Sequence, residues 1–422
     1  MKNIPNVNYV TKNDLCLGCG ICQGSCPFNA IKIGIKKGCF RPEINSELCR
    51  NKLGCHRCFS TCPGIEINFK DLNSKISKDE KKINNLIGNY IKCYTGYSND
   101  YDIRYHAASG GLVTQTLIYL LRNKIIDGAV VTRFDKNSPL LVNSFIATTE
   151  EEVLSAKSSK YSPVNFSNIV SEIKKTSGNK FVIVGLPCHI EGLRKYELYD
   201  KKFKDKILGY FGLLCSSSRS FYLTEYICKE RGFKVSELES FAYRDNGCLG
   251  NMVAQYKKNG ILNKIEESFE SYYQSLASFF VPTRCKLCID HYAELADVSF
   301  GDIHIKPYSE DKIGTSSLIV RTHFWNEIFL KMNKEGIISL KEVDIKVLNA
   351  SQPMAEVKKT RNLIFCKIRD WLGKQSPRYH DVTYQNVNLK FIKWYLFSSI
   401  QHFIGFNKIM WWIIPIIKKI TK

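Results

Sequence analysis

The chain has 422 residues, a formal net charge of +21 and 17 cysteines. Its length is enough for two or three domains with a sizeable core. The positive charge suits nucleic acid, an acidic membrane face or an acidic protein as partner. However, the lysines are spread out and lack the arginine clusters and aromatic-basic interleaving of a nucleic-acid binder. We therefore expect no nucleic-acid partner and assign most of the charge to a solvated surface.

Two cysteine runs open the chain. They are Cys16, Cys19, Cys22 and Cys26 before Pro27, and Cys49, Cys55, Cys58 and Cys62 before Pro63. In the first run, gaps of two, two and three residues and the following proline resemble a bacterial two-cluster ferredoxin domain. In that arrangement the fourth cysteine of each run ligates the other cluster. The resemblance therefore assigns Cys16, Cys19, Cys22 and Cys62 to one 4Fe-4S cluster, and Cys49, Cys55, Cys58 and Cys26 to a second.

The alternatives are a zinc knuckle and a disulfide framework. Zinc sites use paired cysteines set further apart than a tandem run. Disulfides need an oxidising compartment, and residues 1–15 carry no apolar export signal, so we expect a cytoplasmic protein. Five residues separate Cys49 from Cys55 where the motif has two, which makes Cys39 a candidate substitute for Cys49. His56 is expected to be a surface residue.

Residues 71–89 are rich in lysine, asparagine and serine, and predict a linker without a packed core. Residues 90–235 then alternate between helical and strand patterns. We predict helices over 110–124, 166–175 and 190–199, strands over 129–132, 181–185 and 207–214, and a capping box in which Thr149 opens a short helix. This alternation predicts an α/β sheet with parallel pairing, which binds ligands at the carboxyl ends of its strands.

The rest of the chain divides in two. Residues 236–350 read as mixed β and helix, with a hairpin turn at 258–260 and a strand over 317–321. Residues 351–422 form a basic, aromatic tail in which no apolar run reaches the roughly 18 residues of a membrane span. Such a tail suits either a helix lying in a membrane interface or a helix that packs on the body or on a partner.

A second cysteine constellation lies beyond the opening runs. Cys188 and Cys215 each follow a predicted strand, and Cys285 and Cys288 form a Cys-x-x-Cys pair. Strand ends lie close together in a sheet, so these four thiolates suggest a third cubane cluster or a zinc site. The alternative is buried free cysteine, which is the reading we give to Cys39, Cys93, Cys228, Cys248 and Cys366.

Several short blocks resemble the beta-subunit family of coenzyme F-420 (deazaflavin) hydrogenases and dehydrogenases. They are Ala108-Ser109-Gly110-Gly111, Lys160-Tyr161, Gly185 to Leu193, Gly212 to Cys215, Tyr243-Arg244-Asp245, Cys285 to Cys288 and Asp297 to Asp302. The resemblance covers roughly residues 10–325. It implies FAD in the α/β domain and a cluster held at Cys188, Cys215, Cys285 and Cys288. A plant chlorophyll reductase belongs to the same group, so a deazaflavin substrate is not obligatory.

The residues expected to contact the flavin are Ser109, Gly110, Gly111, Lys160, Tyr161 and Arg244. The glycines open a helix whose N-terminus favours anions. Lys160 and Tyr161 offer a cation and an aromatic face, and Arg244 offers a phosphate contact. Without the family resemblance, Ser109-Gly110-Gly111 would be interpreted as a helix cap and Lys160-Tyr161 as a surface pair. Arg244 would be interpreted as the partner of Asp245 in an ion pair. No general acid or base is recognisable, so the catalytic residues stay unassigned.

The sequence thus predicts an α+β ferredoxin-like two-cluster domain (1–70), a linker (71–89), an α/β flavin-binding domain (90–235), a mixed β extension (236–350) and a basic tail (351–422). We expect an iron–sulfur flavoprotein oxidoreductase that links clusters through FAD to a small organic substrate or to a deazaflavin- or nicotinamide-type cofactor. The alternative is a non-catalytic electron-transfer subunit. Expected partners are a ferredoxin, a flavodoxin or a redox subunit, a second copy of the chain, and the inner membrane face through the tail.

Overall fold

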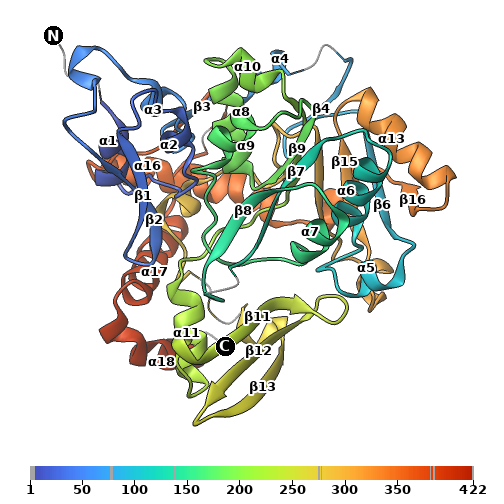
Figure 1. The fold of residues 1–422 in the computed structure, drawn as a ribbon. Coiled ribbons are helices and arrows are strands. Elements are labelled where there is room, and N and C mark those ends of the chain that lie inside the picture. The colour runs from blue at the N-terminus through green and yellow to red at the C-terminus, as the bar shows by residue number, and fades with distance from the viewer. Residues whose placement is uncertain are drawn as a thin grey trace.

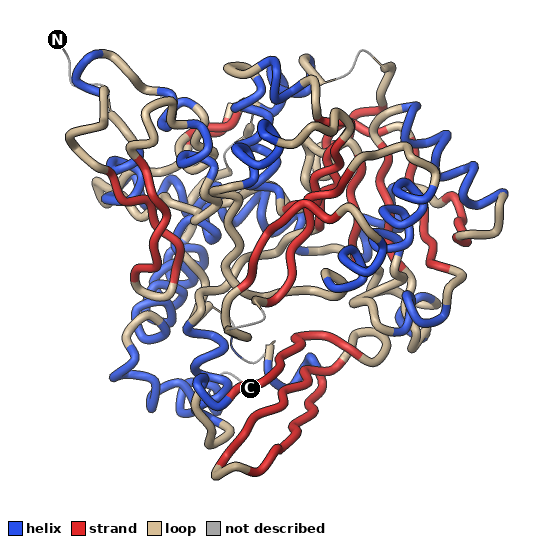
Figure 2. The backbone as a smooth tube through the Cα atoms, in the orientation of Figure 1, coloured by secondary structure: helices blue, strands red, loops and turns tan. Residues whose placement is uncertain are grey.

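The computed structural model describes residues 5–76, 79–135, 138–273, 276, 278–380, 382–383 and 385–420. Figure 1 shows an N-terminal unit and the C-terminal helices on one side of a central sheet, with α13 (His323–Lys334) and β16 (Ile338–Glu342) on the opposite side. Figure 2 shows that long loops join these helices and strands, so a large part of the chain lies outside regular secondary structure. Within the described residues, no helix is long and apolar enough to cross a membrane.

The N-terminal unit is small and built around a hairpin. Its elements are α1 (Val7–Lys12), α2 (Ile21–Ser25), β1 (Ile31–Lys36), β2 (Cys39–Ile44), η1 (Asn51–Leu53), α3 (Arg57–Ser60), β3 (Glu66–Ile67) and α4 (Phe69–Ser74). Strands β1 and β2 pair antiparallel. Both cysteine runs lie in this unit, on the loops and helices α2 and α3 that flank the hairpin.

The central sheet has eight strands in the order β16-β6-β15-β14-β10-β9-β7-β8. Their bounds are β6 (Lys92–Ser98), β7 (Gly128–Phe134), β8 (Val142–Ala147), β9 (Phe181–Gly185), β10 (Ile207–Leu213), β14 (Val298–Asp302) and β15 (Ser316–Val320), with β16 as above. Strands β7, β9, β10 and β14 run parallel, and the outer pairings are antiparallel.

Helices cover both faces of this sheet. They are α5 (Tyr101–Tyr105), α6 (Leu112–Arg122), α7 (Glu150–Ser155), α8 (Ile169–Lys175), α9 (Pro187–Glu197) and α10 (Lys201–Lys204), besides α13. Because side chains alternate along a strand, Val182 packs with α6 and α13 on one face, whereas Ile183 packs with α8 and α9 on the other. The core that contains Ile183 continues into the N-terminal unit, which is thereby packed against the sheet.

A second, three-stranded sheet and a helical layer complete the molecule. The sheet is an antiparallel meander of β11 (Leu238–Asp245), β12 (Asn251–Lys258) and β13 (Ile261–Ser268). Around it lie α11 (Tyr222–Glu230), η2 (Val235–Glu237), α12 (Phe269–Tyr272), η4 (Thr283–Leu287) and η5 (Tyr308–Glu310). The C-terminal elements are α14 (Ile345–Ser351), α15 (Met354–Val357), η6 (Lys358–Asn362), α16 (Leu363–Trp371), β17 (Arg378–Tyr379), α17 (Leu389–Gly405), η7 (Lys408–Ile413) and α18 (Ile414–Ile420).

Several predicted elements are confirmed. Helix α6, strands β7, β9, β10 and β15, and the hairpin between β12 and β13 lie where the patterns placed them. The capping box is also present, because the side chains of Thr149 and Glu152 bond the opposite backbone groups at the start of α7. Helix α9 begins earlier than predicted because Pro187 occupies its first turn, where the missing N–H costs nothing.

The parallel pairing predicted for the strands of 90–235 is confirmed for β7, β9 and β10. The sheet also has antiparallel pairs toward its ends, because β7–β8 and β14–β15 are joined without a crossover helix. One expectation is wrong. The stretch 71–89 is not an unpacked linker in its described part. Leu72 and Ile87 are buried, and β4 (Lys82–Asn84) and β5 (Gly88–Tyr90) form a small hairpin. Residues 77–78 of that stretch lie outside the described residues.

Candidate functional site

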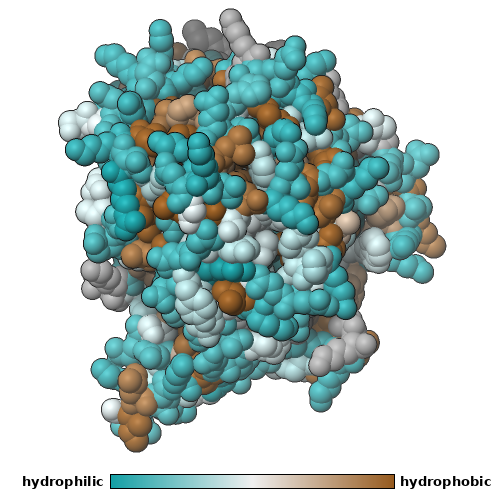
Figure 3. All heavy atoms as spheres, turned by 90° about the vertical axis from the view of Figure 1, so that its right-hand side faces the viewer, coloured by the Kyte–Doolittle hydropathy of each residue, from teal (hydrophilic) through white to brown (hydrophobic). Residues whose placement is uncertain are grey.

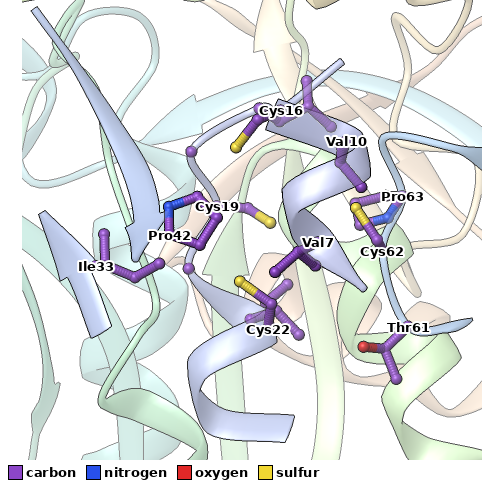
Figure 4. Close-up of a pocket in the computed structure, with 14 residues that line it drawn as sticks. Val7, Val10, Cys16, Cys19, Cys22, Ile33, Pro42, Thr61, Cys62 and Pro63 are labelled. Carbon is purple, nitrogen blue, oxygen red and sulfur yellow. The ribbon is translucent and has the colours of Figure 1, made fainter. Parts of the chain in front are cut away.

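The first cysteine set surrounds a single cavity. Cys16, Cys19, Cys22 and Cys62 line it together with apolar residues, and Figure 4 shows their side chains coming from the loop before α2, from α2 itself and from the segment before Pro63. The apolar lining comes mainly from Val7, Val10, Ile33, Pro42 and Pro63. This is the crossed ligand set that the ferredoxin pattern predicts, with Cys62 of the second run joining three cysteines of the first.

The environment of these thiols favours a metal centre. Burial, together with repulsion from Cys16, raises the pKa of Cys62 to about 11. Burial and the neighbouring thiolates also raise the pKa of Cys19 and Cys22 above the ordinary thiol value. Thiolates crowded in an apolar cavity need positive charge beside them, and the irons of a cluster supply it. The residues present therefore fit a cubane cluster.

The second set also assembles. Burial, with repulsion from the other three thiolates of the set (Cys26, Cys49 and Cys55), raises the pKa of Cys58 to about 11. The amide of Asn6 donates to Cys49 Sγ at 3.8 Å, and the backbone N–H of Ala30 donates to Cys26 Sγ at 3.4 Å. The long gap between Cys49 and Cys55 is taken up by the short helix η1, so the widened spacing does not remove Cys49 from its set.

Cys39 lies elsewhere. Burial, with Cys285 and Cys16 as its neighbouring thiolates, raises the pKa of Cys39 to about 11. It is therefore placed between the first set and the third set rather than beside Cys55 and Cys58. His56 is exposed, and its Nδ1 lies 3.0 Å from the carbonyl oxygen of Gly54.

The third set converges from three parts of the chain. Cys188 lies in the first turn of α9, Cys215 follows β10, and Cys285 and Cys288 lie in and directly after η4. Burial, with Cys285 and Cys288 among the neighbouring charges, raises the pKa of Cys215 to about 12 although Lys358 opposes it. Burial also raises the pKa of Cys188, and the thiolates of Cys19 in the first set and of Cys215 and Cys285 in the third raise it further.

Among the described residues, no three His, Cys, Asp or Glu side chains meet closely enough to hold one metal ion. This finding excludes, among the described residues, a site in which three such side chains bind one metal ion, but it does not bear on a cluster of several irons. The thiolates around a zinc ion all lie about 2.3 Å from it, whereas the cysteines of a cubane cluster each bind a different iron and stand farther apart.

The first and third sets are joined through protein contacts. The backbone N–H of Phe166 donates to the carbonyl of Cys19 at 2.8 Å, which ties the first loop to the α/β region. Gly20 makes this approach because its φ is 78° and a Cβ there would lie 2.7 Å from Ser167 N. Arg284, directly before Cys285, donates to the carbonyls of Pro63 and Gly64 at 3.0 Å.

A third region lies near the carboxyl ends of β10 and β14. The Arg244 guanidinium is buried, donates to Asp302 Oδ2 at 2.7 Å and to Tyr161 Oη at 3.4 Å, and also donates to the carbonyl of Ala108. Tyr161 lies against the rings of Tyr243, Phe269 and Tyr273, with the Tyr273 centroid at 4.3 Å. The result is an aromatic cluster beside a buried arginine, at the sheet edge where ligands bind.

This aromatic cluster adjoins the third cysteine set. Burial raises the pKa of Tyr273, and the thiolates of Cys215 and Cys285 are among the charges that raise it further. The Arg219 guanidinium lies 4.6 Å from the Tyr273 ring, and its Nε is buried and has no hydrogen-bond partner among the described residues. Ser220 Oγ beside it is likewise unpaired there. Unpaired buried donors are costly, so these atoms fit a site that an acceptor-rich group completes.

Three family models match this chain. The model described as "Coenzyme F420 hydrogenase/dehydrogenase, beta subunit N-term" matches residues 93–171, the corresponding C-terminus model matches residues 178–346, and a "4Fe-4S binding domain" matches residues 9–32. The chain belongs to the coenzyme F420 hydrogenase/dehydrogenase beta-subunit family. The resemblance seen in the short sequence blocks is thereby confirmed.

Relatives of this family resemble the chain over most of its length. A coenzyme F420-dependent sulfite reductase of Methanocaldococcus jannaschii is 27% identical over 84% of this chain, which spans only 52% of that protein. An uncharacterized protein of the same organism is 32% identical, over 57% of this chain and 85% of its own length. The coenzyme F420 hydrogenase beta subunit of Methanococcus voltae is 28% identical, over 65% of this chain and 93% of its own length.

One solved structure has the same fold. A chain of the F420-reducing NiFe hydrogenase complex from Methanosarcina barkeri superposes with a TM-score of 0.54 at 22% identity, covering 70% of this chain and 98% of that one. Together these matches place this chain in an iron–sulfur oxidoreductase family whose members include subunits of larger redox complexes.

The flavin contacts expected from the family resemblance lie in one region but are largely occupied by protein. Lys160 Nζ donates to the carbonyls of Ala156, Lys157 and Ser158, and burial lowers its pKa to about 7. Ser109 Oγ donates to the carbonyl of Thr315 at 2.9 Å, and the N–H of Gly110 donates to Ser316 Oγ at 2.9 Å. Gly111, with a φ of 74°, is the N-cap of α6. Of the six residues expected to contact the flavin, Tyr161 is the best placed to do so, because its ring lies in the aromatic cluster.

Three charged residues of the candidate site were not predicted from the sequence, namely Arg219, Lys358 and Arg284. Arg219 stands alone in a serine-rich loop, and Lys358 is one of 61 lysines and arginines. Lys358 is 1% exposed, lies in η6 and donates to the carbonyl of Cys215 at 2.8 Å and to that of Asp290. Only Arg284 carried a signal, since it directly precedes the Cys-x-x-Cys pair.

Proposed function

We propose that this chain is an iron–sulfur flavoprotein oxidoreductase that passes single electrons between three 4Fe-4S clusters and an FAD. The clusters are held by the three cysteine sets, and the flavin lies in the aromatic region of Tyr161 and Tyr273. When bound, the flavin links one-electron to two-electron chemistry, so it exchanges a hydride with a small organic substrate or a deazaflavin- or nicotinamide-type cofactor. The two-cluster ferredoxin region corresponds to residues 1–70 and the flavin-binding region to 90–235.

The observation that carries this proposal is the sequence of contacts from one cysteine set to the next. Cys19 of the first set is a neighbour of Cys188 in the third, and Arg284 bonds the segment after Cys62 while preceding Cys285. Tyr273 then adjoins both Cys215 and the aromatic region. A series of neighbouring redox sites through the protein suits electron transfer better than three unrelated structural metals.

The residues of the flavin region have separable roles in the proposal. Tyr161 and Tyr273 offer apolar faces that exclude water from the ring. The unpaired Nε of Arg219 supplies a donor for an anionic or carbonyl oxygen. Arg244 is held by Asp302 and by the Ala108 carbonyl, so it orients the loop before α6 rather than contacting the flavin directly.

The experiment is anaerobic purification followed by iron, sulfide, zinc and flavin determination. The proposal expects a yellow-brown protein with about twelve irons, four for each cubane cluster, and about one FAD. Colourless protein that contains zinc would overturn it. Arg219→Gln is expected to lower the flavin content at least about fivefold while iron is unchanged, because the unpaired donor is lost. Arg133→Gln is the matched control, since Arg133 also lies over an aromatic ring, at 4.1 Å from Phe145.

The second candidate function is an electron-transfer subunit without its own substrate. It is favoured by the relatives, several of which are named as subunits. The basic surface suits docking of an acidic ferredoxin, flavodoxin or partner subunit. Turnover by the isolated chain with an artificial electron donor supports an enzyme. Full cofactor content without turnover on deazaflavin or nicotinamide cofactors supports the subunit.

A further inference from the structure

The C-terminal helices leave an apolar face uncovered. Trp394 is 44% exposed, Phe403 61% and Trp412 67%. Other exposed apolar side chains of α17, η7 and α18 are Leu389, Leu396, Phe397, Ile400, Ile409, Ile416 and Ile420. By contrast, Figure 3 shows that the face carrying α13 and β16 is mostly hydrophilic, with only scattered hydrophobic side chains. An apolar face of this extent on a folded chain marks an interaction site.

These helices are fixed to the body by their other face. Trp411 is buried against Tyr226 and Phe280, and its Nε1 donates to the carbonyl of Gly405 at 3.0 Å. Gly405 lies so close to the chain that a Cβ there would be 1.7 Å from Phe279 O. The exposed face is therefore held in place by the buried contacts that its other face makes with the body.

The charge of this segment has a single sign. Residues 382–422 contain no aspartate or glutamate, whereas lysines occupy positions 390, 393, 408, 418, 419 and 422. Lys408 and Lys418 pair with Glu225 and Glu230 of α11. Lys390 and Lys393 flank Trp394, and Lys390 Nζ lies 4.7 Å from the Trp394 ring centroid. The uncovered face thus combines tryptophan, phenylalanine and isoleucine with a lysine border.

We propose that this face docks the protein on an anionic bilayer surface, with α17 and α18 lying in the plane of the interface. Helices with aromatic and aliphatic residues on one side and lysines at the border bind in this way, tryptophan favours the headgroup level, and anionic lipids attract the lysines. A protein interface is a poorer explanation because lysine is depleted there. Nothing in this proposal depends on which cofactors the chain carries.

Docking would place one candidate redox centre near the membrane. Lys286, between Cys285 and Cys288, donates from Nζ to the carbonyl of Ser398 in α17. The loop that carries these two cysteines is therefore bonded directly to the docking helix. A substrate or electron carrier that is itself attached to lipid would approach the protein from this side.

The test is flotation of the full, cofactor-loaded chain with vesicles of phosphatidylcholine alone or with about 30% phosphatidylglycerol as the anionic lipid. Phe397→Glu combined with Ile400→Glu is expected to lower binding to anionic vesicles at least about tenfold. The matched control is Ile261→Glu with Leu262→Glu. These two residues are 67% and 57% exposed, but lie at the hairpin of β12 and β13. Circular dichroism and iron content check that each variant is folded.

Binding that requires phosphatidylglycerol, weakens with salt and is lost only in the α17 variant supports the proposal. Equal binding by both double variants overturns it, because the C-terminal face would then have no special role. Failure of the wild-type chain to float with anionic vesicles also overturns it. If the chain instead self-associates in sedimentation and the α17 variant abolishes that, the face is an interface between copies of the chain.

Discussion

At the scale of single residues, Lys358 is the most informative side chain outside the sequence motifs. It is fully buried, donates to the carbonyls of Cys215 and Asp290, and has thiols and the Asp290 carboxyl group among its counter-charges. Burial opposes the charged form, yet the thiolates of Cys288 and Cys215 outweigh it and raise the pKa of Lys358. A buried lysine that stays charged requires anions beside it, which is what a thiolate-bound cluster provides.

Removing the charge of Lys358 is expected to change the reduction potential of the proposed third cluster. Lys358→Met should make the reduction potential of that cluster more negative, on the order of 100 mV, because reduction adds an electron that the lysine no longer stabilises. A redox titration followed by electron paramagnetic resonance measures this shift. Lys359→Met is the matched control, because Lys359 is paired with Glu294. An unchanged potential in Lys358→Met would contradict a cluster at Cys215 and Cys288.

Cys49 and Cys39 give a second residue-scale prediction. Cys49 lies with Cys26, Cys55 and Cys58, whereas Cys39 lies between Cys16 and Cys285. Cys49→Ser is therefore expected to lose up to about four irons, those of one cubane cluster, and Cys39→Ser none. Iron determination with an absorbance spectrum on both anaerobically purified variants provides the measurement. Loss of iron from Cys39→Ser alone would reverse the assignment.

At the scale of elements, the helices and strands that could be predicted from the sequence are those with a regular local pattern of apolar residues. Helix α6 and strand β9 were recognised because their apolar residues repeat with one period over a sufficient length. The ends of the central sheet were not, because strand direction depends on connections rather than on residue pattern. The burial of Leu72 in α4 was also missed, since it depends on the core that the N-terminal unit shares with the sheet.

The candidate site follows the same division. Cysteine spacing predicted the candidate ligands of the two tandem runs, because cysteines two or three residues apart can reach one cluster. The candidate third set was predicted from strand ends and one Cys-x-x-Cys pair, since its members lie far apart in the sequence. The aromatic cluster of Tyr161, Phe269 and Tyr273 and the buried Arg219 come from separate elements and share no motif. Their proximity is created by the fold alone, so no local pattern contains it.

Arg284 shows how one side chain joins two elements. It is 1% exposed, lies in η4, and bonds the carbonyls of Pro63 and Gly64 across to the N-terminal unit. Arg284→Met would leave both carbonyls unpaired. The expected destabilisation is about 3 kcal/mol, since hydrogen bonds to a charged group contribute about 1.5–3 kcal/mol each. Chemical denaturation of the iron-loaded protein measures this loss.

The matched control for Arg284 is Arg361→Met. Arg361 stacks over Phe365 with its guanidinium 5.5 Å from the ring centroid, and its Nε donates to Oδ1 of the adjacent Asn362 at 3.2 Å. The expected change there is below about 1 kcal/mol, typical of a residue that joins no distant elements. Equal destabilisation by the two variants would mean that Arg284 does not join the units.

At the scale of the whole molecule, the fold places the cysteine sets in a series. The second and first sets share the N-terminal unit, the first set meets α9 of the sheet through Cys19 and Cys188, and the third set adjoins the aromatic region through Tyr273. One continuous core connects that unit to the sheet. The positions of these sites are therefore fixed relative to one another, as the proposed stepwise electron transfer requires.

This order makes a prediction about electron flow. Cys285→Ser should remove the third centre while the ferredoxin sets, in the other unit, keep their iron, so the chain is expected to lose about four irons. Electrons given to the ferredoxin clusters must then cross the gap left by the third centre, and flavin reduction should slow by about a hundredfold or more, roughly 2.7 kcal/mol in the barrier. Rapid-mixing absorbance at flavin wavelengths, after reduction by a low-potential donor, measures this rate.

Cys228→Ser is the matched control, because Cys228 is buried in α11 away from the three sets. Unchanged flavin reduction in Cys285→Ser despite the lost iron would mean that the ferredoxin clusters reach the flavin by another route.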